Sequence, residues 1–127
     1  MAYLFLWTII ERYASLSYGP ALKPEQKVEE FGEEHAFEQA LKRVVIRKSK
    51  KPLYDSQDPE MDAAYLDPAS SASSVKYYRR VRNNLTHRGK GAWNDCEIVR
   101  CSLLELQEIV RLVLVKRMGL EMEFPTP

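Results

Sequence analysis

Apolar side chains recur at helical spacing near the start of the chain. In residues 3–17 one stripe is formed by Leu6, Trp7, Ile10, Tyr13 and Ala14. A first helix that buries this side is predicted, and the Tyr-Gly-Pro sequence at residues 18–20 ends it. A polar helix is expected over residues 24–34, followed by an amphipathic helix over residues 36–47. The apolar positions of the latter are Phe37, Ala40, Leu41, Val44 and Val45.

A third strong pattern begins after a run of serines. Ser73 or Ser74 is the expected N-cap, because a serine hydroxyl accepts a hydrogen bond from the first turn. We expect this helix to fray near His87, with Gly89 as its C-terminal stop. The predicted buried stripe consists of Val75, Tyr78, Val81 and Leu85.

The most regular pattern lies near the end of the chain. The Asn-Asp-Cys-Glu sequence at residues 94–97 resembles the start of a capped helix, and Gly119 is a typical helix end. Between them the apolar residues alternate in steps of four and three, the seam of a packed helix pair. These residues are Val99, Leu103, Leu106, Val110 and Val113. The fold class is therefore predicted to be all-α, with this helix as the longest element.

A long connection, residues 49–74, separates the two halves of the chain. It contains prolines and the serine-rich run at residues 70–74. Connections of this length without secondary structure are usually functional or disordered. We therefore predict a mobile loop or flap over residues 53–74 that buries little. The apolar run at residues 44–46 leaves open a short strand, although no partner strand is evident.

The composition fits one small globular domain that covers residues 1–127. With 45% apolar residues the chain can bury a small core and is too apolar to be disordered. The apolar run at its start is about ten residues, short of the roughly 20 that span a bilayer. No lysine or arginine precedes this run, unlike in a signal peptide. We expect a buried first helix, a cytoplasmic protein and no membrane contact, and the sequence leaves open a piece of a longer protein.

Charge is segregated along the chain, although the formal net charge is only +1. Residues 25–38 are rich in glutamate, whereas residues 42–51 and 76–90 are basic and contain no acid. Basic blocks that converge in a fold make a surface that attracts phosphate. We interpret residues 42–51 as a solvated face. The basic block at residues 76–90 is the stronger candidate for binding an anion.

The cysteines and histidines do not predict a metal site. Cys96 and Cys101 are the only cysteines, and on one helix they lie roughly 140° apart and cannot bridge each other. We interpret them as reduced thiols of an intracellular protein. Paired Cys or His spacing typical of zinc is missing, so neither a metal nor another cofactor is predicted. His35 lies in an acidic stretch and is interpreted as a surface residue.

The basic block contains the sequence Arg-Asn-Asn-Leu-Thr-His, which ends at His87. Arg82 is four residues after Tyr78 and three before Leu85. It lies at the edge of the predicted buried stripe, where an arginine can reach along an interface towards an anion. His87 follows about 7.5 Å further along the axis, and both side chains can meet one phosphate only if the last turn loosens. The amide of Asn83 can orient the imidazole or a substrate oxygen.

This motif resembles that of the HEPN superfamily, whose name abbreviates higher eukaryotes and prokaryotes nucleotide-binding. The family motif is arginine, four to six residues and then histidine, often with Asn, Asp or His directly after the arginine. Arg82, Asn83 and His87 take these positions here, and the basic segment at residues 88–90 also resembles members of the family. One toxin branch has a tyrosine two residues after the histidine, where this chain departs from it with Gly89.

The resemblance implies a four- to five-helix up-and-down bundle that forms a homodimer and cleaves RNA in a composite cleft, without a metal. It implies catalytic roles for Arg82, Asn83 and His87. Many members act in toxin–antitoxin, phage-defence or RNA-processing systems, so an antitoxin or a larger protein is a further expected partner. The candidates for substrate binding are Arg79, Thr86, Arg88 and Lys90.

The residue types suit RNA cleavage. RNA carries its own nucleophile, the 2′-hydroxyl, and histidine titrates in the range needed to take or give the proton. Arginine holds two phosphate oxygens with a planar fork and stays charged throughout. Two copies of His87 in a dimer would divide the acid and base roles, which explains how one histidine per chain suffices.

Two other interpretations stand beside the catalytic one. The first is a HEPN-like module that has lost catalysis and binds a nucleotide or a partner, for which one open cleft is expected. The second is a structural interaction domain, in which Arg82 pairs with a core carboxylate such as Glu11 and His87 caps its helix. Catalysis predicts instead that His87 is accessible and faces its symmetry mate.

Overall fold

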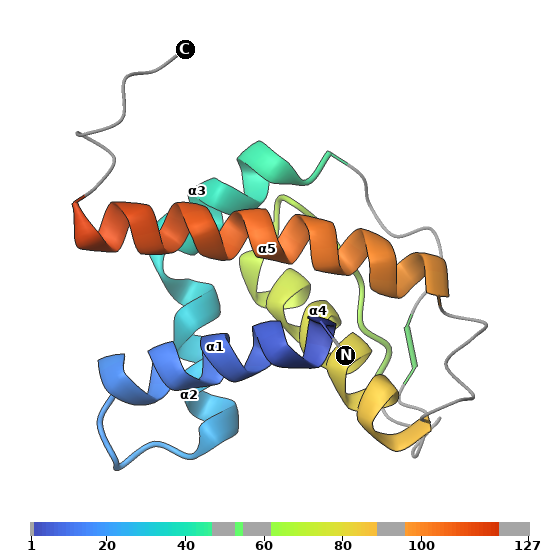
Figure 1. Cartoon of the computed structure of the whole chain (residues 1–127), viewed down its shortest axis with the longest axis horizontal. Coiled ribbons are helices and arrows are strands. Elements are labelled where there is room, and N and C mark those ends of the chain that lie inside the picture. Colours follow the sequence, from blue (N-terminus) through green and yellow to red (C-terminus); the bar gives the residue numbers. More distant parts are fainter. Residues whose placement is uncertain (1, 47–52, 55–61, 89–95, 120–127) are drawn as a thin grey trace.

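The computed structural model describes residues 2–46, 53–54, 62–88 and 96–119 (Figure 1). These residues form five helices: α1 (Ala2–Ser17), α2 (Pro24–Glu33), α3 (His35–Val44), α4 (Ser71–Arg88) and α5 (Cys96–Met118). Over the same ranges the only β pairing is one isolated antiparallel bridge between Leu53 and Ala64. The predicted all-α class is confirmed, and α5 is the longest described helix with 23 residues.

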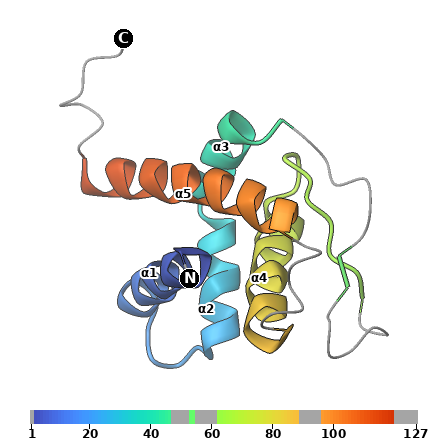
Figure 2. The ribbon, with the colours of Figure 1, turned by 45° about the vertical axis from the view of Figure 1, so that its right-hand side comes forward.

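An antiparallel pair of helices, α2 and α4, forms the centre of the arrangement. Glu25 at the start of α2 lies near Arg79 of α4, whereas Gly32 at the end of α2 meets Val75 near the start of α4. Figure 2 shows α5 running at a steep angle to these two helices. It packs mainly against α3 and also contacts α1 and α4, while α1 packs beside α2. The described helices form a bundle, but α5 is not aligned with α2 and α4 as in a simple up-and-down arrangement.

Gly32 sets how closely α2 and α4 approach. A Cβ atom at this position would lie 2.5 Å from Val75 Cγ1 and 2.9 Å from Val75 Cβ, distances that real Cβ atoms do not tolerate. Glycine in a helix interior costs about 1 kcal/mol relative to alanine. The close helix contact explains why the sequence has a glycine in the last turn of α2.

The predicted apolar stripes face the core, although Val44, Val99 and Leu103 are only half-buried. In α1 the stripe is buried apart from the half-buried Tyr13, and the apolar start of the chain is a helix with one face in the core. The largest fully buried side chains are Trp7, Tyr3, Tyr78, Phe31 and Phe37. Phe31 packs edge to face on Phe37, with ring centroids 5.2 Å apart. Among the described residues, no helix combines the length and apolarity needed to cross a membrane.

The start of α4 differs from the prediction. The helix begins at Ser71, and the Oγ atom of Ser70 accepts a hydrogen bond from the Ser73 backbone N–H at 3.3 Å. Ser70 is therefore the capping residue, rather than Ser73 or Ser74. Ser74 is buried instead, and its hydroxyl donates to the Asp67 carbonyl at 2.6 Å. The serine run, which looked like part of a loop, forms the first turn of α4 and fastens the preceding segment to it.

Helix ends differ from the predictions in two further places. α3 ends at Val44, short of residue 47, and the described residues that follow form no strand. α4 stays helical through Arg88, one residue past the predicted fraying at His87, and the predicted stop at Gly89 lies outside the described residues. Positions 82 and 87 consequently remain in regular helix, roughly 140° apart around its axis. The predicted end of α5 is confirmed by Gly119, which has a φ of 73°.

Part of the long connection is packed in the core. Ala64 and Leu66 are each 1% exposed, and Leu53 and Ala64 exchange two backbone hydrogen bonds of 2.9 Å. The prediction that residues 53–74 bury little is therefore wrong for this stretch. Residues 55–61 of the predicted flap lie outside the described residues.

Candidate functional site

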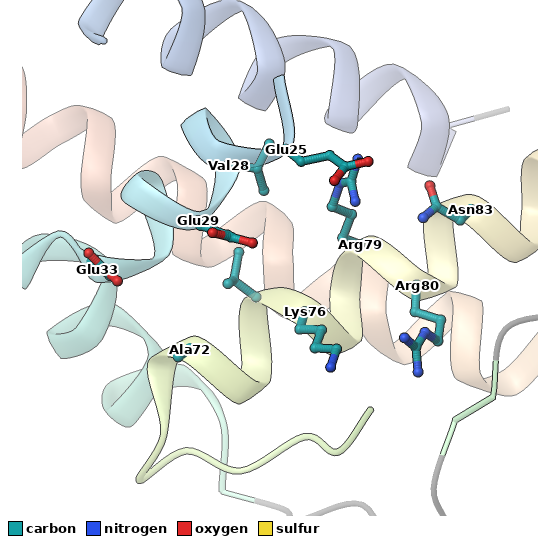
Figure 3. A pocket seen from close by; sticks show the side chains of 10 residues that line it. Glu25, Val28, Glu29, Glu33, Ala72, Lys76, Arg79, Arg80 and Asn83 are labelled. Atoms are coloured by element: carbon teal, nitrogen blue, oxygen red, sulfur yellow. The ribbon is translucent and has the colours of Figure 1, made fainter. Parts of the chain in front are cut away.

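Polar side chains of the basic block leave α4 on three different sides. Arg79 and Asn83 line a groove beside α2. Arg80 also borders this groove, but its guanidinium and the amide of Asn84 bind the connection that precedes α4. Arg82 lies on the third side and contacts α1. Figure 3 shows Arg79 directed towards α2 and Arg80 directed away from it. The acid-free block of the sequence is therefore not one continuous positive surface.

Arg82 is held by two neighbours. Its Nη2 atom donates to Glu11 Oε1 of α1 at 3.1 Å, and its Nη1 atom donates to Asn83 Oδ1 at 3.0 Å. The side chains of Arg82 and Glu11 are 31% and 41% exposed. The ion pair that the structural interpretation predicts is therefore present, but it lies at the rim of the molecule, where water reaches both partners.

Asn83 has two roles in this geometry. Its amide oxygen orients the Arg82 guanidinium, and its side chain also lines the groove between α2 and α4. The sequence predicted an orienting role for Asn83 towards the imidazole or a substrate oxygen. In the described residues the group that it orients is the guanidinium.

The groove between α2 and α4 has a volume of about 530 Å³. Its walls carry opposite charges, glutamates from α2 and basic side chains from α4 (Figure 3). Arg79 Nη2 lies 3.8 Å from Glu25 Oε1. A nucleic-acid strand, which is uniformly negative, would be repelled by the glutamate wall. We therefore do not place an RNA path in this groove, although the predicted substrate-binding residue Arg79 lines it.

Arg80 and Asn84 were not predicted as site residues, yet both are buried, with 5% and 6% exposure. Arg80 Nη1 donates to the carbonyl oxygens of Leu53, at 3.1 Å, and of Asp62. Asn84 Nδ2 donates to the carbonyl oxygen of Tyr54 at 3.0 Å. These two side chains supply donors to a segment that has little secondary structure of its own.

A signal for this pair was present in the sequence. Arg80 and Asn84 are one helical turn apart and follow Tyr77 by three and seven residues, a spacing that puts all three on one helix face. A long connection next to such a face needs donors for its carbonyl groups, because buried backbone groups are almost always hydrogen-bonded. Long polar side chains on a helix face can provide them.

The remaining predicted site residues are placed in different ways. Thr86 Oγ1 donates to the Arg82 carbonyl at 3.1 Å, a bond within the helix that points to no ligand. The backbone of His87 and Arg88 forms the last turn of α4, whereas their side chains lie outside the described part of the structure, as does Lys90. The structure thus brings together Arg82 and Asn83, and adds Glu11.

The position of α1 does not depend on the ion pair at Arg82. The Tyr3 hydroxyl donates to the Tyr78 carbonyl at 2.7 Å, and Tyr13 and Tyr18 both donate to the Glu34 carboxylate. Burial raises the pKa of all three tyrosines, and for Tyr13 and Tyr18 the bond to the carboxylate raises the pKa further. These contacts fix both ends of α1 against the core.

The described histidine, cysteine and carboxylate side chains form no metal site. Over the described ranges, no three His, Cys, Asp or Glu side chains are grouped so that they could hold a metal ion. Cys101 is a free, half-buried thiol, and the side chain of Cys96 lies outside the described residues. His35 is exposed, as predicted.

Comparisons of the chain with known protein families, with curated proteins and with solved structures found no match. The resemblance to the HEPN superfamily therefore rests on the motif around Arg82 and on the order of the helices.

Proposed function

We propose that this chain is a metal-independent endoribonuclease of the HEPN type that acts as a homodimer. The observation that carries the proposal is the Arg82 guanidinium, which Asn83 Oδ1 orients at 3.0 Å and which is 31% exposed. A guanidinium has five N–H donors in a fixed fork. A half-exposed fork with a fixed orientation is suited to hold two oxygens of one phosphate group.

In the proposed mechanism, Arg82 stabilises the negative charge that develops on the phosphate as the 2′-hydroxyl attacks. His87 takes the proton from that hydroxyl or gives one to the leaving 5′-oxygen. Asn83 acts as a positioning residue, because its amide oxygen accepts a hydrogen bond from the Arg82 guanidinium. No metal ion has a role in this scheme.

The geometry of α4 supports the proposed dimer. Positions 82 and 87 are roughly 140° apart on a regular helix, so one chain cannot easily direct both side chains to one phosphate. A second copy can supply the missing group. The outer face of α1 supports such a contact, since Phe5, Ile9 and Leu16 are 68%, 39% and 74% exposed and fall on one stripe of the helix.

The proposed setting is the one that the resemblance implies, a toxin–antitoxin or phage-defence system in the cytoplasm, with RNA as substrate and an antitoxin or a larger protein as partner. The site residues support RNA cleavage, whereas the cellular system is proposed from the resemblance alone. A free nuclease is harmful to its host, which is consistent with control by a partner.

A second candidate function is a structural or binding domain without catalysis. The Glu11–Arg82 pair at 3.1 Å favours it, because a structural role needs only that the arginine be neutralised. This candidate predicts that Arg82 and His87 affect folding alone.

The proposal is tested by incubating the purified protein with total RNA in the presence of EDTA. We expect cleavage by the wild type and its loss in His87→Ala and Arg82→Ala. The chain offers matched controls, since His35 and Arg12 are exposed residues of the same types. Their alanine variants should cleave like the wild type. Cleavage retained in His87→Ala would contradict the role of His87, and no cleavage by the folded wild type would favour the second candidate.

Mixing variants tests the composite site. Arg82→Ala and His87→Ala are each expected to be inactive. A refolded mixture should recover a small part of the activity, because hybrid dimers contain one intact arginine and one intact histidine but lack the second histidine that shares the acid and base roles. Absence of recovery, with dimers shown by sedimentation, would contradict a shared cleft. A monomer at micromolar concentration would contradict the dimer itself.

A further inference from the structure

The contact between Glu11 and Arg82 has the chemistry of an occupied anion site. A carboxylate presents two oxygens to an arginine in the same way as a phosphate does. Glu11 Oε1 lies 3.1 Å from Arg82 Nη2, while Asn83 holds the other terminal nitrogen at 3.0 Å. The position that an incoming phosphate oxygen would take on Nη2 is thus filled by a carboxylate of the same chain.

The exposure of the pair makes this carboxylate displaceable. The two side chains are 31% and 41% exposed, and ion pairs in contact with water contribute little net stability. Breaking a fully buried pair would strand an uncompensated charge and destabilise the fold strongly. At this rim, water and a phosphate can replace the carboxylate without such a penalty.

Removing the pair should also leave α1 in place. The helix is anchored by the buried side chains of Tyr3, Trp7 and Ile10 and by the hydroxyl of Tyr3 on the Tyr78 carbonyl. A change at Glu11 can therefore alter the charge next to Arg82 without moving the helix that carries it. This separates an effect on binding from an effect on folding.

We infer that Glu11 is an internal competitor for the phosphate-binding position of Arg82, so that it weakens RNA binding and keeps the site closed until a phosphate displaces it. The inference rests on the proposed function, because it assigns a regulatory residue to the same site. In the closed state the guanidinium is paired and already oriented by Asn83. In the open state the same fork binds the phosphate.

The test measures the binding of a short oligoribonucleotide with 2′-O-methyl sugars, which lacks the free 2′-hydroxyl and cannot be cleaved. We expect Glu11→Gln to bind this RNA about three- to fivefold more tightly than the wild type, the scale of a half-exposed ion pair. Glu30→Gln is the matched control, because it removes one exposed carboxylate of α2 and the same net charge. It should change the affinity much less.

A double-mutant cycle distinguishes competition from a general charge effect. Arg82→Ala should weaken binding, and in that background Glu11→Gln should have no further effect, because the group for which Glu11 competes is gone. Melting curves of all variants serve as the folding readout. If Glu11→Gln lowers the melting temperature, Glu11→Asp, which keeps the charge on a shorter side chain, should bind with intermediate affinity.

The outcomes separate this inference from the proposed function. If Arg82→Ala weakens binding while Glu11→Gln binds like Glu30→Gln, the competition is wrong and the phosphate site stands. Equal binding by Arg82→Ala and wild type, or no binding by either, overturns both. A gain in affinity that persists in the Arg82→Ala background also overturns the competition.

Discussion

Arg80 and Arg82 lie two positions apart on α4 and have opposite environments. Arg80 is 5% exposed and donates to backbone carbonyls of the connection. Arg82 is 31% exposed and pairs with a carboxylate. Arg80 is buried and stabilises the packing of the connection, whereas the guanidinium of Arg82 is accessible at the surface. Residue type alone therefore does not separate a structural arginine from a candidate catalytic one.

The physical difference lies in the partners. Carbonyl oxygens accept hydrogen bonds from Nη1 of Arg80 but do not neutralise its charge, and burial of the side chain limits the access of an external anion. The Glu11 carboxylate neutralises the charge of Arg82 and would compete with a phosphate for the guanidinium. Water reaches both side chains. The comparison predicts that substitutions at the two positions act on different properties, stability for one and cleavage for the other.

The largest expected effect is on cleavage at Arg82. Arg82→Ala should lower the rate of RNA cleavage roughly 100- to 10,000-fold, as for loss of a preorganised transition-state contact, and should lower the free energy of unfolding by at most about 1 kcal/mol. Arg82→Lys should not rescue the rate, because an ammonium cannot copy the bidentate fork. Single-turnover cleavage with EDTA and chemical denaturation measure the two effects. If Arg82→Ala lowers stability and leaves cleavage unchanged, Arg82 is a structural residue like Arg80 and the contrast between them is wrong.

The next effect concerns Arg80. Arg80→Ala should lower the free energy of unfolding by about 2–4 kcal/mol, because two carbonyl oxygens lose a charged donor in a buried place. Cleavage at temperatures where the variant is folded should stay close to that of the wild type. Denaturant titration is the measurement, and Arg12→Ala, at an exposed arginine, is the control. A stable Arg80→Ala variant would show that the connection does not depend on this contact.

A smaller effect of the same kind is expected for the neighbouring asparagines. Asn84→Ala should cost about 1–2 kcal/mol of stability, since the Tyr54 carbonyl loses its donor. Asn83→Ala should leave stability within about 0.5 kcal/mol and should slow cleavage less than Arg82→Ala, because it only positions the guanidinium. Denaturation and cleavage assays on both variants show whether Asn84 affects mainly stability and Asn83 mainly cleavage.

The last effect appears only at alkaline pH and concerns the anchoring of α1. The pKa values of Tyr3, Tyr13 and Tyr18 are raised in the folded state, whereas an unfolded tyrosine titrates near pH 10. Their stabilising effect is complete below about pH 10 and is lost as the pH rises above it. Denaturation at pH 8 and above pH 10 should show the loss. Tyr3→Phe should reduce this pH dependence, and Tyr65→Phe, at an exposed tyrosine, should not.

The sequence predicted much of the fold because helical periodicity is local. The stripe of Val75, Tyr78, Val81 and Leu85 is buried as expected, and Gly119 ends α5. The start of α4 was placed too late, because a serine run is compatible with both a loop and a capped first turn. Only the contacts of these hydroxyls with the preceding segment distinguish the two.

The candidate site was predictable in part. The position of Arg82 at the edge of a buried stripe follows from its spacing to Tyr78 and Leu85, and it is half-buried as expected. The roles of Arg80 and Asn84 were not foreseen, because they depend on where the connection runs after it leaves α3. The spacing of Arg80 and Asn84 indicates a helix face that can donate hydrogen bonds, but it does not identify the segment that packs against that face.

The sequence by itself determined that this chain is helical, where its helices lie within a few residues, and which faces they bury, because these properties depend on neighbours three and four positions away. It also supplied the motif from Arg82 to His87. Only the tertiary structure decided that Arg82 meets Glu11, that Arg80 binds the connection, and that the α2–α4 groove carries opposite charges. These contacts join residues far apart in the chain, and no local periodicity encodes which of them will meet.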